Sequence, residues 1–180
     1  MSSQTNASPK HAMPPGLSQK DATVVLIDIA WMTSIIEMLP DEPTVIAFLD
    51  GFYRLCSQHI EKGGGEVIKY MGDSCFALYD AKESGAAIRD VQAIRDAFPG
   101  YGREFGLPNS DVRAAIHIGE VVTGTFGPQG IKDVLGKAPG VVMSMNRHGI
   151  SITEQVYRKL PSSERTPWRK KGGNVTYILP

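Results

Sequence analysis

Two aspartates stand where apolar segments end, and their carboxylates are the groups of this chain best placed to do chemistry. Asp28 directly follows the apolar residues 24–27, and Asp73 lies in a short turn between the apolar-rich segments 66–71 and 74–79. A carboxylate beside buried apolar residues is costly unless it stays hydrated, pairs with a cation or holds a metal. Two such acids on adjacent strands would suit a pair of Mg²⁺ ions, which makes phosphoryl transfer the first hypothesis.

The elements that must position these acids can be predicted from periodicity and chain breakers. Apolar, β-branched residues predict a buried strand over 22–28, and helical spacing predicts a helix over 43–62 that is capped by Asp41. The Gly72-Asp73 pair predicts a two-residue type II′ turn, which takes glycine at its first position. The other predicted elements are a helix over 82–98 ended by Pro99-Gly100, strands over 112–118 and 131–135, helices over 140–147 and 153–160, and a hairpin over 166–179 turning at 172–173.

The order of these elements predicts an α+β fold of the ferredoxin-like or palm type. Such a fold is a sandwich in which an antiparallel-rich β-sheet carries helices packed on it. Residues 1–20 are rich in Ser, Gln, Asn and Pro. This composition predicts a disordered N-terminal tail or linker, followed by one domain over 21–180.

The composition is that of a globular protein and argues against several other classes. The 180 residues are 42% hydrophobic. Because 19 basic residues balance 19 acidic ones, no excess of positive charge indicates nucleic-acid binding. No apolar run reaches the roughly 18 residues of a transmembrane helix, and the first 20 residues lack the apolar core of a signal peptide. Cys56 and Cys75 both lie in apolar patterns, which favours buried thiols and a cytoplasmic location.

Five motifs, in order along the chain, resemble the catalytic domain of class III nucleotidyl cyclases. The resemblance extends over about residues 22–179, and each motif is weak by itself but specific in this order. The motifs are Val24-Leu26-Asp28-Ile29 with Thr33, Gly64-Gly65 with Lys69-Tyr70-Met71-Gly72-Asp73, the segment 116–124, the segment 132–136, and the segment 170–179.

The resemblance implies an adenylate cyclase-like domain that converts ATP to 3′,5′-cyclic AMP and pyrophosphate by two-metal catalysis. In this family the ribose 3′-oxygen attacks the α-phosphorus while pyrophosphate leaves. The resemblance further implies that Asp28 and Asp73 bridge two Mg²⁺ or Mn²⁺ ions. The backbone carbonyl of Ile29 would complete the second metal's shell, and Thr33 would lie in the phosphate loop.

The same resemblance gives roles to three residues further along the chain. Lys69 and Asp133 match the residues that read adenine, the lysine at a ring nitrogen and the aspartate at the exocyclic amine. Guanine-specific members usually carry Glu at the lysine position, so Lys69 favours ATP over GTP. Lys171 matches a lysine that contacts the triphosphate.

The chain departs from the family after the segment 132–136. The family places an Asn and, four residues later, an Arg there, whereas this chain has Gly140 and Ser144. Asn146 and Arg147 are adjacent, so only one of them could face the nucleotide from a helix. Arg147 is the candidate substitute for the arginine, whose loss can cost about 10³–10⁵ in rate in comparable enzymes.

Two further departures concern the phosphate loop and the helix that follows the segment 132–136. Trp31 and Met32 stand where the family has small and aromatic residues, so the indole could crowd the triphosphate or serve as a core anchor. The run Ala138-Pro139-Gly140 is expected to break the start of the helix. Low activity is therefore expected, and the alternative is a catalytically impaired module that binds nucleotide or dimerises for regulation.

Cyclases of this kind act as head-to-tail dimers, which take metal ligands from one subunit and base-reading residues from the other. The resemblance therefore implies a homodimer, or a heterodimer whose partner supplies the missing Asn and Arg. A symmetric homodimer would lack the arginine in both sites. The segment 124–134 is the expected contact between subunits.

Overall fold

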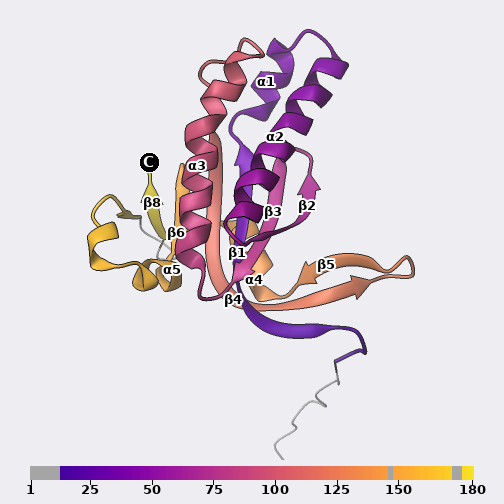
Figure 1. The fold of residues 1–180 in the computed structure, drawn as a ribbon, viewed down its shortest axis with the longest axis vertical. Helices are drawn as coiled ribbons and strands as arrows, with labels where there is room; N and C mark the ends of the chain where they lie inside the picture. The colour runs from indigo at the N-terminus through magenta and orange to yellow at the C-terminus, as the bar shows by residue number, and fades with distance from the viewer. Residues whose placement is uncertain (1–12, 146–147, 172–175) are drawn as a thin grey trace, which may run out of the picture.

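A mixed eight-stranded sheet with helices on both faces is built from residues 13–145, 148–171 and 176–180, which the computed structural model describes (Figure 1). The strands are β1 (Ser18–Ile29), β2 (Glu66–Met71), β3 (Ser74–Asp80), β4 (Val112–Phe126), β5 (Ile131–Leu135), β6 (Ile150–Thr153), β7 (Arg169–Lys171) and β8 (Thr176–Leu179). The helices are α1 (Met32–Met38), α2 (Glu42–Lys62), α3 (Ser84–Arg103), α4 (Lys137–Ser144) and α5 (Glu154–Lys159), with a 3₁₀ turn over Ser162–Glu164.

The strand order is β2-β3-β1-β4-β6-β8-β7, and β5 pairs with the far end of β4 outside this path. Neighbouring strands run antiparallel, except that β4 and β6 are parallel. The predicted α+β fold, with an antiparallel-rich sheet and helices packed on it, is confirmed. The sequence pattern does not predict α1 and β6, which have seven and four residues and are too short to show a clear period.

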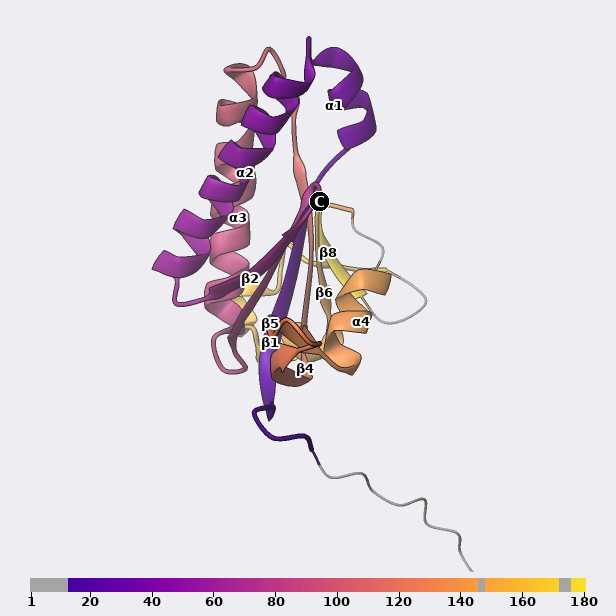
Figure 2. The same ribbon diagram turned by 90° about the vertical axis from the view of Figure 1, so that its right-hand side faces the viewer.

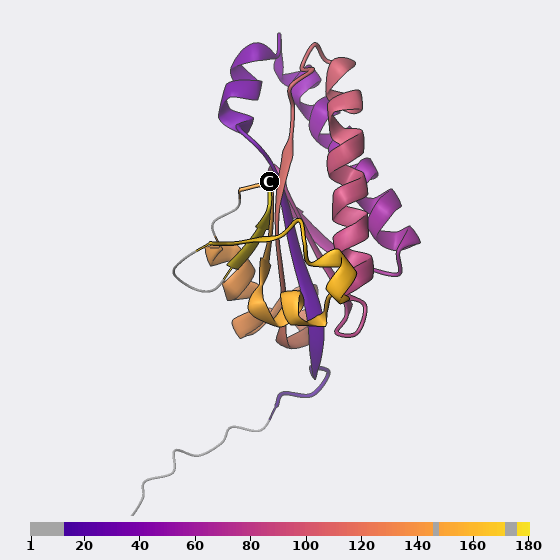
Figure 3. The same ribbon diagram turned by 90° about the vertical axis from the view of Figure 1, so that its left-hand side faces the viewer.

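Helices α2, α3 and α5 cover one face of the sheet, and α4 covers the other (Figures 2 and 3). Each face has its own apolar core. On β1, Val25 and Ile27 pack with α2 and α3, whereas Val24 and Leu26 pack with α4. Because side chains alternate along a strand, Asp28 belongs to the face that α4 covers, which we call the α4 face.

The central strand β1 contains the predicted strand 22–28 and is longer at both ends. Residues 22–29 are buried, which explains their uninterrupted apolar run, and residues 18–21 are exposed. This exposed part pairs with the far end of β4, from Ser18 opposite Thr123 onwards. The strand thus begins within the segment that the composition predicts as a tail.

Helix α2 and the β2–β3 hairpin confirm the prediction within one residue. The Thr44 backbone N–H donates to the Asp41 carboxylate across 2.9 Å, so Asp41 is the N-cap. Gly72 has a φ of 62°, and Asp73 has a negative φ, as a type II′ turn requires. The helix buries one apolar stripe against the sheet, made of Phe48, Phe52, Cys56 and Ile60.

Helix α3 does not end at Pro99-Gly100, and the predicted boundary is wrong. The helix continues to Arg103 with Pro99 inside it. Proline removes one helical hydrogen bond, but tertiary packing of the next turn offsets that loss. Tyr101 donates a hydrogen bond to the Phe48 carbonyl across 2.8 Å, and its ring stacks on that of Phe48. Gly102 is buried against the loop that leads to β4.

Helix α4 also corrects the prediction, because it spans Lys137–Ser144 and not 140–147. Pro139 does not break the helix start. It lies in the first turn, where backbone N–H groups have no partner inside a helix. Likewise, β4 is one continuous strand where only 112–118 was predicted. The predicted hairpin turn at 172–173 and residues 146–147 lie outside the described residues. In the part of the chain that the structure covers, no helix is long and apolar enough to cross a membrane.

Candidate functional site

Asp28 lies near the end of β1 with only 7% of its surface exposed. Its neighbours across the sheet are Ser74 of β3 and Arg113 of β4. A guanidinium nitrogen of Arg113 lies 3.9 Å from a carboxylate oxygen of Asp28. The cation partly neutralises this buried acid, which explains how the strand end can carry a charge.

Asp73 is held against the end of β1 by its backbone. The Ile29 N–H donates to the Asp73 carbonyl oxygen across 3.0 Å. On the other side of the turn, the Tyr53 hydroxyl donates to the Gly72 carbonyl oxygen across 2.5 Å, and its ring stacks on Tyr70. Burial and then the charge of Asp73 raise the pKa of Tyr53, so this hydroxyl stays protonated as a donor. The structure therefore brings the two acid-bearing segments together.

Lys69 is directed to the α4 face by an irregularity in β2. Val67 lies opposite Ala77, but Lys69 lies opposite Phe76, so Ile68 is an extra residue in a β-bulge. Without the bulge, Lys69 would face the α2 and α3 core. Phe76 belongs to the apolar cluster beneath α4, and Lys69 shares this side of the sheet.

On that face, Lys69 and Asp133 form a two-pronged ion pair. The Lys69 ammonium lies 2.8 Å from both carboxylate oxygens of Asp133. Burial opposes ionisation of Asp133, but the hydrogen bonds from Lys69 and the Val134 N–H outweigh it and lower the pKa of Asp133. Next to this pair, Lys132 bonds to Glu66. Two ion pairs thus attach β5 to β2, and the predicted combination of Lys69 with Asp133 is present.

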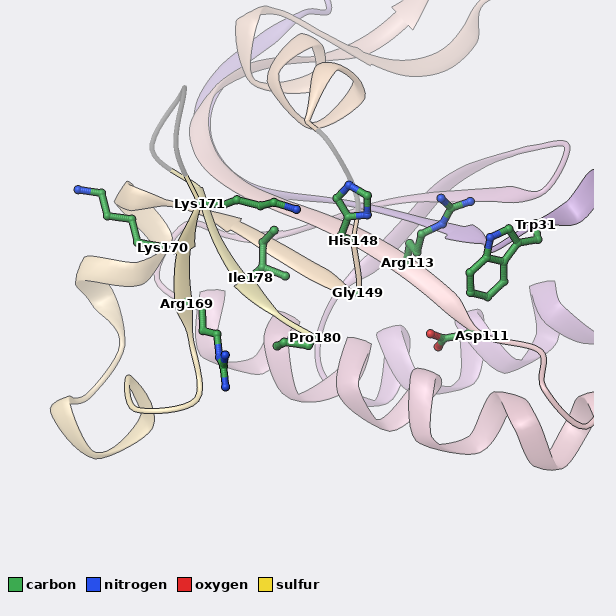
Figure 4. A pocket seen from close by; sticks show the side chains of 10 residues that line it. All are labelled: Trp31, Asp111, Arg113, His148, Gly149, Arg169, Lys170, Lys171, Ile178 and Pro180. Carbon is green, nitrogen blue, oxygen red and sulfur yellow. The ribbon is translucent and has the colours of Figure 1, made fainter.

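A cavity of about 530 Å³ opens beside Arg113 and is rich in basic side chains (Figure 4). The Lys171 side chain extends towards His148, while the Lys170 ammonium points away (Figure 4). The one acidic side chain of the lining, Asp111, is held by Arg95 at 3.0 Å. The lining includes Trp31, Arg113, His148, Arg169, Lys170 and Lys171.

The chain is 31% identical over 163 residues to an adenylate cyclase of Anabaena cylindrica, an alignment that covers 82% of this chain and 32% of that protein. A bacterial light-regulated adenylyl cyclase superposes with a TM-score of 0.81 at 19% identity, over 91% of this chain and 52% of that one. An adenylyl cyclase from P. aeruginosa gives a TM-score of 0.75 at 17% identity, over 89% and 93% of the two chains.

The chain is a class III nucleotidyl cyclase homology domain. No family model matches it. The domain spans about a third of the curated relative it matches, so that protein contains further segments. A guanylyl cyclase has the same fold, with a TM-score of 0.75 at 18% identity over 90% of this chain and 92% of that one. The fold therefore does not decide which base is bound.

The predicted metal ligands of this cyclase homology domain have donor atoms that suit divalent cations. Asp28 and Asp73 offer carboxylates and Ile29 a backbone carbonyl, which are the oxygen ligands that Mg²⁺ prefers. In residues 13–145, 148–171 and 176–180, no group of three or more His, Cys, Asp or Glu side chains could hold a metal. Two carboxylates, completed by the phosphates of a substrate, are the usual arrangement for Mg²⁺ at nucleotide sites.

The other predicted site residues that the structure describes lie on α1, on α4 and at the basic cavity. Thr33 is exposed in the first turn of α1, and Lys171 lines the basic cavity. On α4, Gly140 has open space around it, and the Ser144 hydroxyl donates to the Val141 carbonyl across 2.9 Å. Neither can replace a cationic side chain. Arg147, the candidate substitute, lies outside the described residues.

Sequence reasoning missed Arg113, and of the two alternatives that it left open for Trp31 the structure excludes one. Arg113 is the one Lys, Arg, Asp or Glu residue in the predicted strand 112–118, and pairing this strand with 22–28 in register would have placed it opposite Asp28. Trp31 is no core anchor, because 62% of its surface is exposed. It lies at the edge of the cavity with its ring 5.9 Å from the Arg113 guanidinium carbon.

His117 gives the domain a pH-dependent stability. Burial lowers the pKa of His117 below its ordinary 6.5, and its Nδ1 lies 3.0 Å from the Thr153 hydroxyl. The unfolded chain therefore binds this proton at a higher pH than the folded chain. The stability that neutral His117 contributes is complete above pH 6.5 and decreases as the pH falls below it.

We expect the melting temperature of the wild type to decrease between pH 7.5 and pH 5.5. The variant His117→Asn, whose amide can keep the bond to Thr153, should show a smaller decrease. Thermal denaturation followed by circular dichroism at both pH values measures the difference. Equal decreases in both proteins would contradict this assignment.

Proposed function

We propose that the domain converts ATP to 3′,5′-cyclic AMP and pyrophosphate at a low rate, with two Mg²⁺ or Mn²⁺ ions. The observation that carries this proposal is the β-bulge of β2, which turns Lys69 to the α4 face to meet Asp133. Asp28 belongs to the same face. The proposed base-reading pair and Asp28, one of the two proposed metal ligands, thus lie on one side of the sheet, where a nucleotide shared with a second subunit could reach them.

In the reaction, the chain's own groups act mainly by position and charge. Asp28 and Asp73 would hold the two metal ions, and the Ile29 carbonyl would add a ligand. Bound there, the metals would favour the 3′-oxygen as nucleophile and neutralise the triphosphate. The Tyr53 hydrogen bond to the Gly72 carbonyl keeps the turn of Asp73 in place.

Adenine recognition would fall to Lys69 and Asp133. Lys69 can donate to a ring nitrogen that lacks hydrogen, and Asp133 can accept from the exocyclic amine. Guanine presents a hydrogen at that ring position and a carbonyl in place of the amine, so both contacts would fail. The nucleotide would replace the contact that the two side chains make with each other at 2.8 Å.

The triphosphate would lie against cationic groups of the cavity. Lys171 extends into it, and Arg113 borders it beside the metal-binding acid. Thr33, in the first turn of α1, would complete the phosphate loop. Charge-assisted bonds from such groups to phosphate oxygens are roughly twice as strong as neutral ones.

We further propose a head-to-tail dimer, with a second copy or another cyclase domain as partner. Apolar side chains are exposed at Ile131 and Leu135 of β5 and at Met143 of α4. Their exposed fractions are 63%, 48% and 48%. A partner that covers them would bury apolar area, the main driving force of association.

A second candidate function is favoured by α4 itself. Lys137, at its start, is the one basic residue of this helix, and Gly140 and Ser144 offer no cation. A domain that binds ATP and metal but lacks a group for the transition state would act as a nucleotide-binding or dimerising regulatory module.

The deciding experiment is a turnover assay on the purified chain with ATP and Mn²⁺, combined with calorimetric ATP titration. We expect slow formation of cyclic AMP and metal-dependent ATP binding. Metal-dependent binding without product would establish the regulatory alternative. Absence of both product and metal-dependent binding would exclude the proposed function.

A further inference from the structure

Trp31 has a backbone conformation that is unfavourable for its residue type. Its φ of 57° and ψ of 35° lie in the left-handed region, which a bulky side chain rarely adopts. Among the described non-glycine residues, Trp31 alone has a positive φ. Such a conformation costs about 1–3 kcal/mol, which glycine would avoid. Strained backbone positions of this kind cluster at functional sites, which points to a function for this side chain.

The contact that the indole makes is with Arg113. The guanidinium carbon lies 5.9 Å from the ring centroid, within the range of a cation–π interaction. Arg113 Nε is enclosed and has no hydrogen-bond partner among the described residues. Among the described residues, the indole face and the Asp28 carboxylate are the groups that attract this cation.

The ion pair between Arg113 and Asp28 is long. Its nitrogen–oxygen distance is 3.9 Å, whereas Arg95 reaches Asp111 at 3.0 Å. A charge-assisted hydrogen bond has a length of about 2.7–2.9 Å. Arg113 is thus near enough to offset the charge of Asp28, yet it does not form a close bond with this carboxylate.

We propose that Trp31 is a positioning residue that holds Arg113 back from close contact with Asp28, so that the carboxylate can take a divalent cation. The inference rests on the proposed function, in which Asp28 is a metal ligand. A guanidinium that closes onto Asp28 competes with the metal for the same charge. The indole makes that closure less favourable because the guanidinium would have to leave the ring face.

The test measures Mn²⁺ affinity from the electron paramagnetic resonance signal of free Mn²⁺, without nucleotide or turnover. Trp31→Gly should weaken Mn²⁺ binding about 3-fold, the equivalent of a cation–π interaction of about 0.5–1 kcal/mol. Trp31→Phe keeps an aromatic face and should retain most of the affinity. The melting temperature of Trp31→Gly should equal or exceed that of the wild type, because glycine removes the backbone strain.

A double-mutant cycle isolates the role of Arg113. In an Arg113→Gln background the competing cation is absent, so Trp31→Gly should no longer change Mn²⁺ affinity. Unchanged or tighter Mn²⁺ binding in Trp31→Gly, or an equal loss in both backgrounds, overturns the inference. The variant Asp28→Asn distinguishes failure of this inference from failure of the proposed metal site. If Asp28→Asn abolishes Mn²⁺ binding while Trp31→Gly has no effect, only this inference fails. If Asp28→Asn leaves Mn²⁺ binding intact, the proposed metal site fails as well.

Discussion

Replacing Asp28 or Asp73 with asparagine is expected to reduce cyclic AMP formation by a factor on the order of 10³ or more. Each variant keeps the shape of the side chain but removes a negative charge that the two proposed metal ions would require. The loss should extend to metal-dependent ATP binding, which calorimetry measures even where turnover is slow. The two single variants should be nearly as impaired as the double variant, because both acids are expected to serve one metal centre.

Asp50→Asn is the matched control for these variants. Asp50 lies on the exposed side of α2 and pairs with Arg54, with 56% of its side chain accessible. Its replacement should leave turnover and ATP binding unchanged. Melting temperatures of all variants show whether the loss reflects unfolding, which matters for Asp28→Asn because it removes the counter-charge of Arg113. A folded Asp28→Asn protein with wild-type turnover would refute the two-metal proposal.

Replacing Lys69 with glutamate should lower the preference for ATP over GTP by at least about 10²-fold. The variant places two carboxylates where an ion pair now lies at 2.8 Å, so the donor for adenine is lost and the acids repel each other. Sites built around buried polar contacts reject a base that leaves those contacts unmatched. Relative rates, or relative affinities if turnover is too slow, give the ratio.

The double variant Lys69→Glu with Asp133→Ser should then favour GTP. Glutamate can accept from the guanine ring N–H and amine, and serine can donate to the guanine carbonyl. Lys132→Gln is the matched control, because it removes the neighbouring pair with Glu66 but leaves Lys69 and Asp133 in place. An unchanged ratio in Lys69→Glu would show that this hairpin does not read the base.

The predictable parts of the fold are those determined by residues that are close together in the sequence. Asp41 caps α2 with its own side chain, and the Gly72-Asp73 turn follows from the conformational freedom of glycine. The buried strand that ends near Asp28 follows from an apolar run. The family motifs grouped Lys69 with Asp133 as base-reading residues, although they are 64 residues apart and no local pattern connects them; their direct ion pair was not predicted.

The parts that were not predictable depend on tertiary contacts. Pro99 remains inside α3 because Tyr101 and Phe48 stabilise the next turn, and a local rule for proline does not include that packing. The bulge of β2 inserts one residue, Ile68, which changes the face that Lys69 occupies without leaving a mark in the sequence. Arg113 gains its importance only from the register that places it opposite Asp28.

Because ion pairs attach β5 to β2, the proposed base-reading pair and the proposed metal ligand Asp28 should differ in their sensitivity to ionic strength. The bonds of Lys69 to Asp133 and of Lys132 to Glu66 join side chains that are 24% to 63% accessible, so dissolved ions screen them. Asp28 lies near the end of the central strand β1, whose backbone is fixed by ladder hydrogen bonds that salt hardly affects. We therefore expect the proposed selectivity for the base to depend on the surrounding solution, whereas the position of the proposed metal ligand Asp28 is set by the fold.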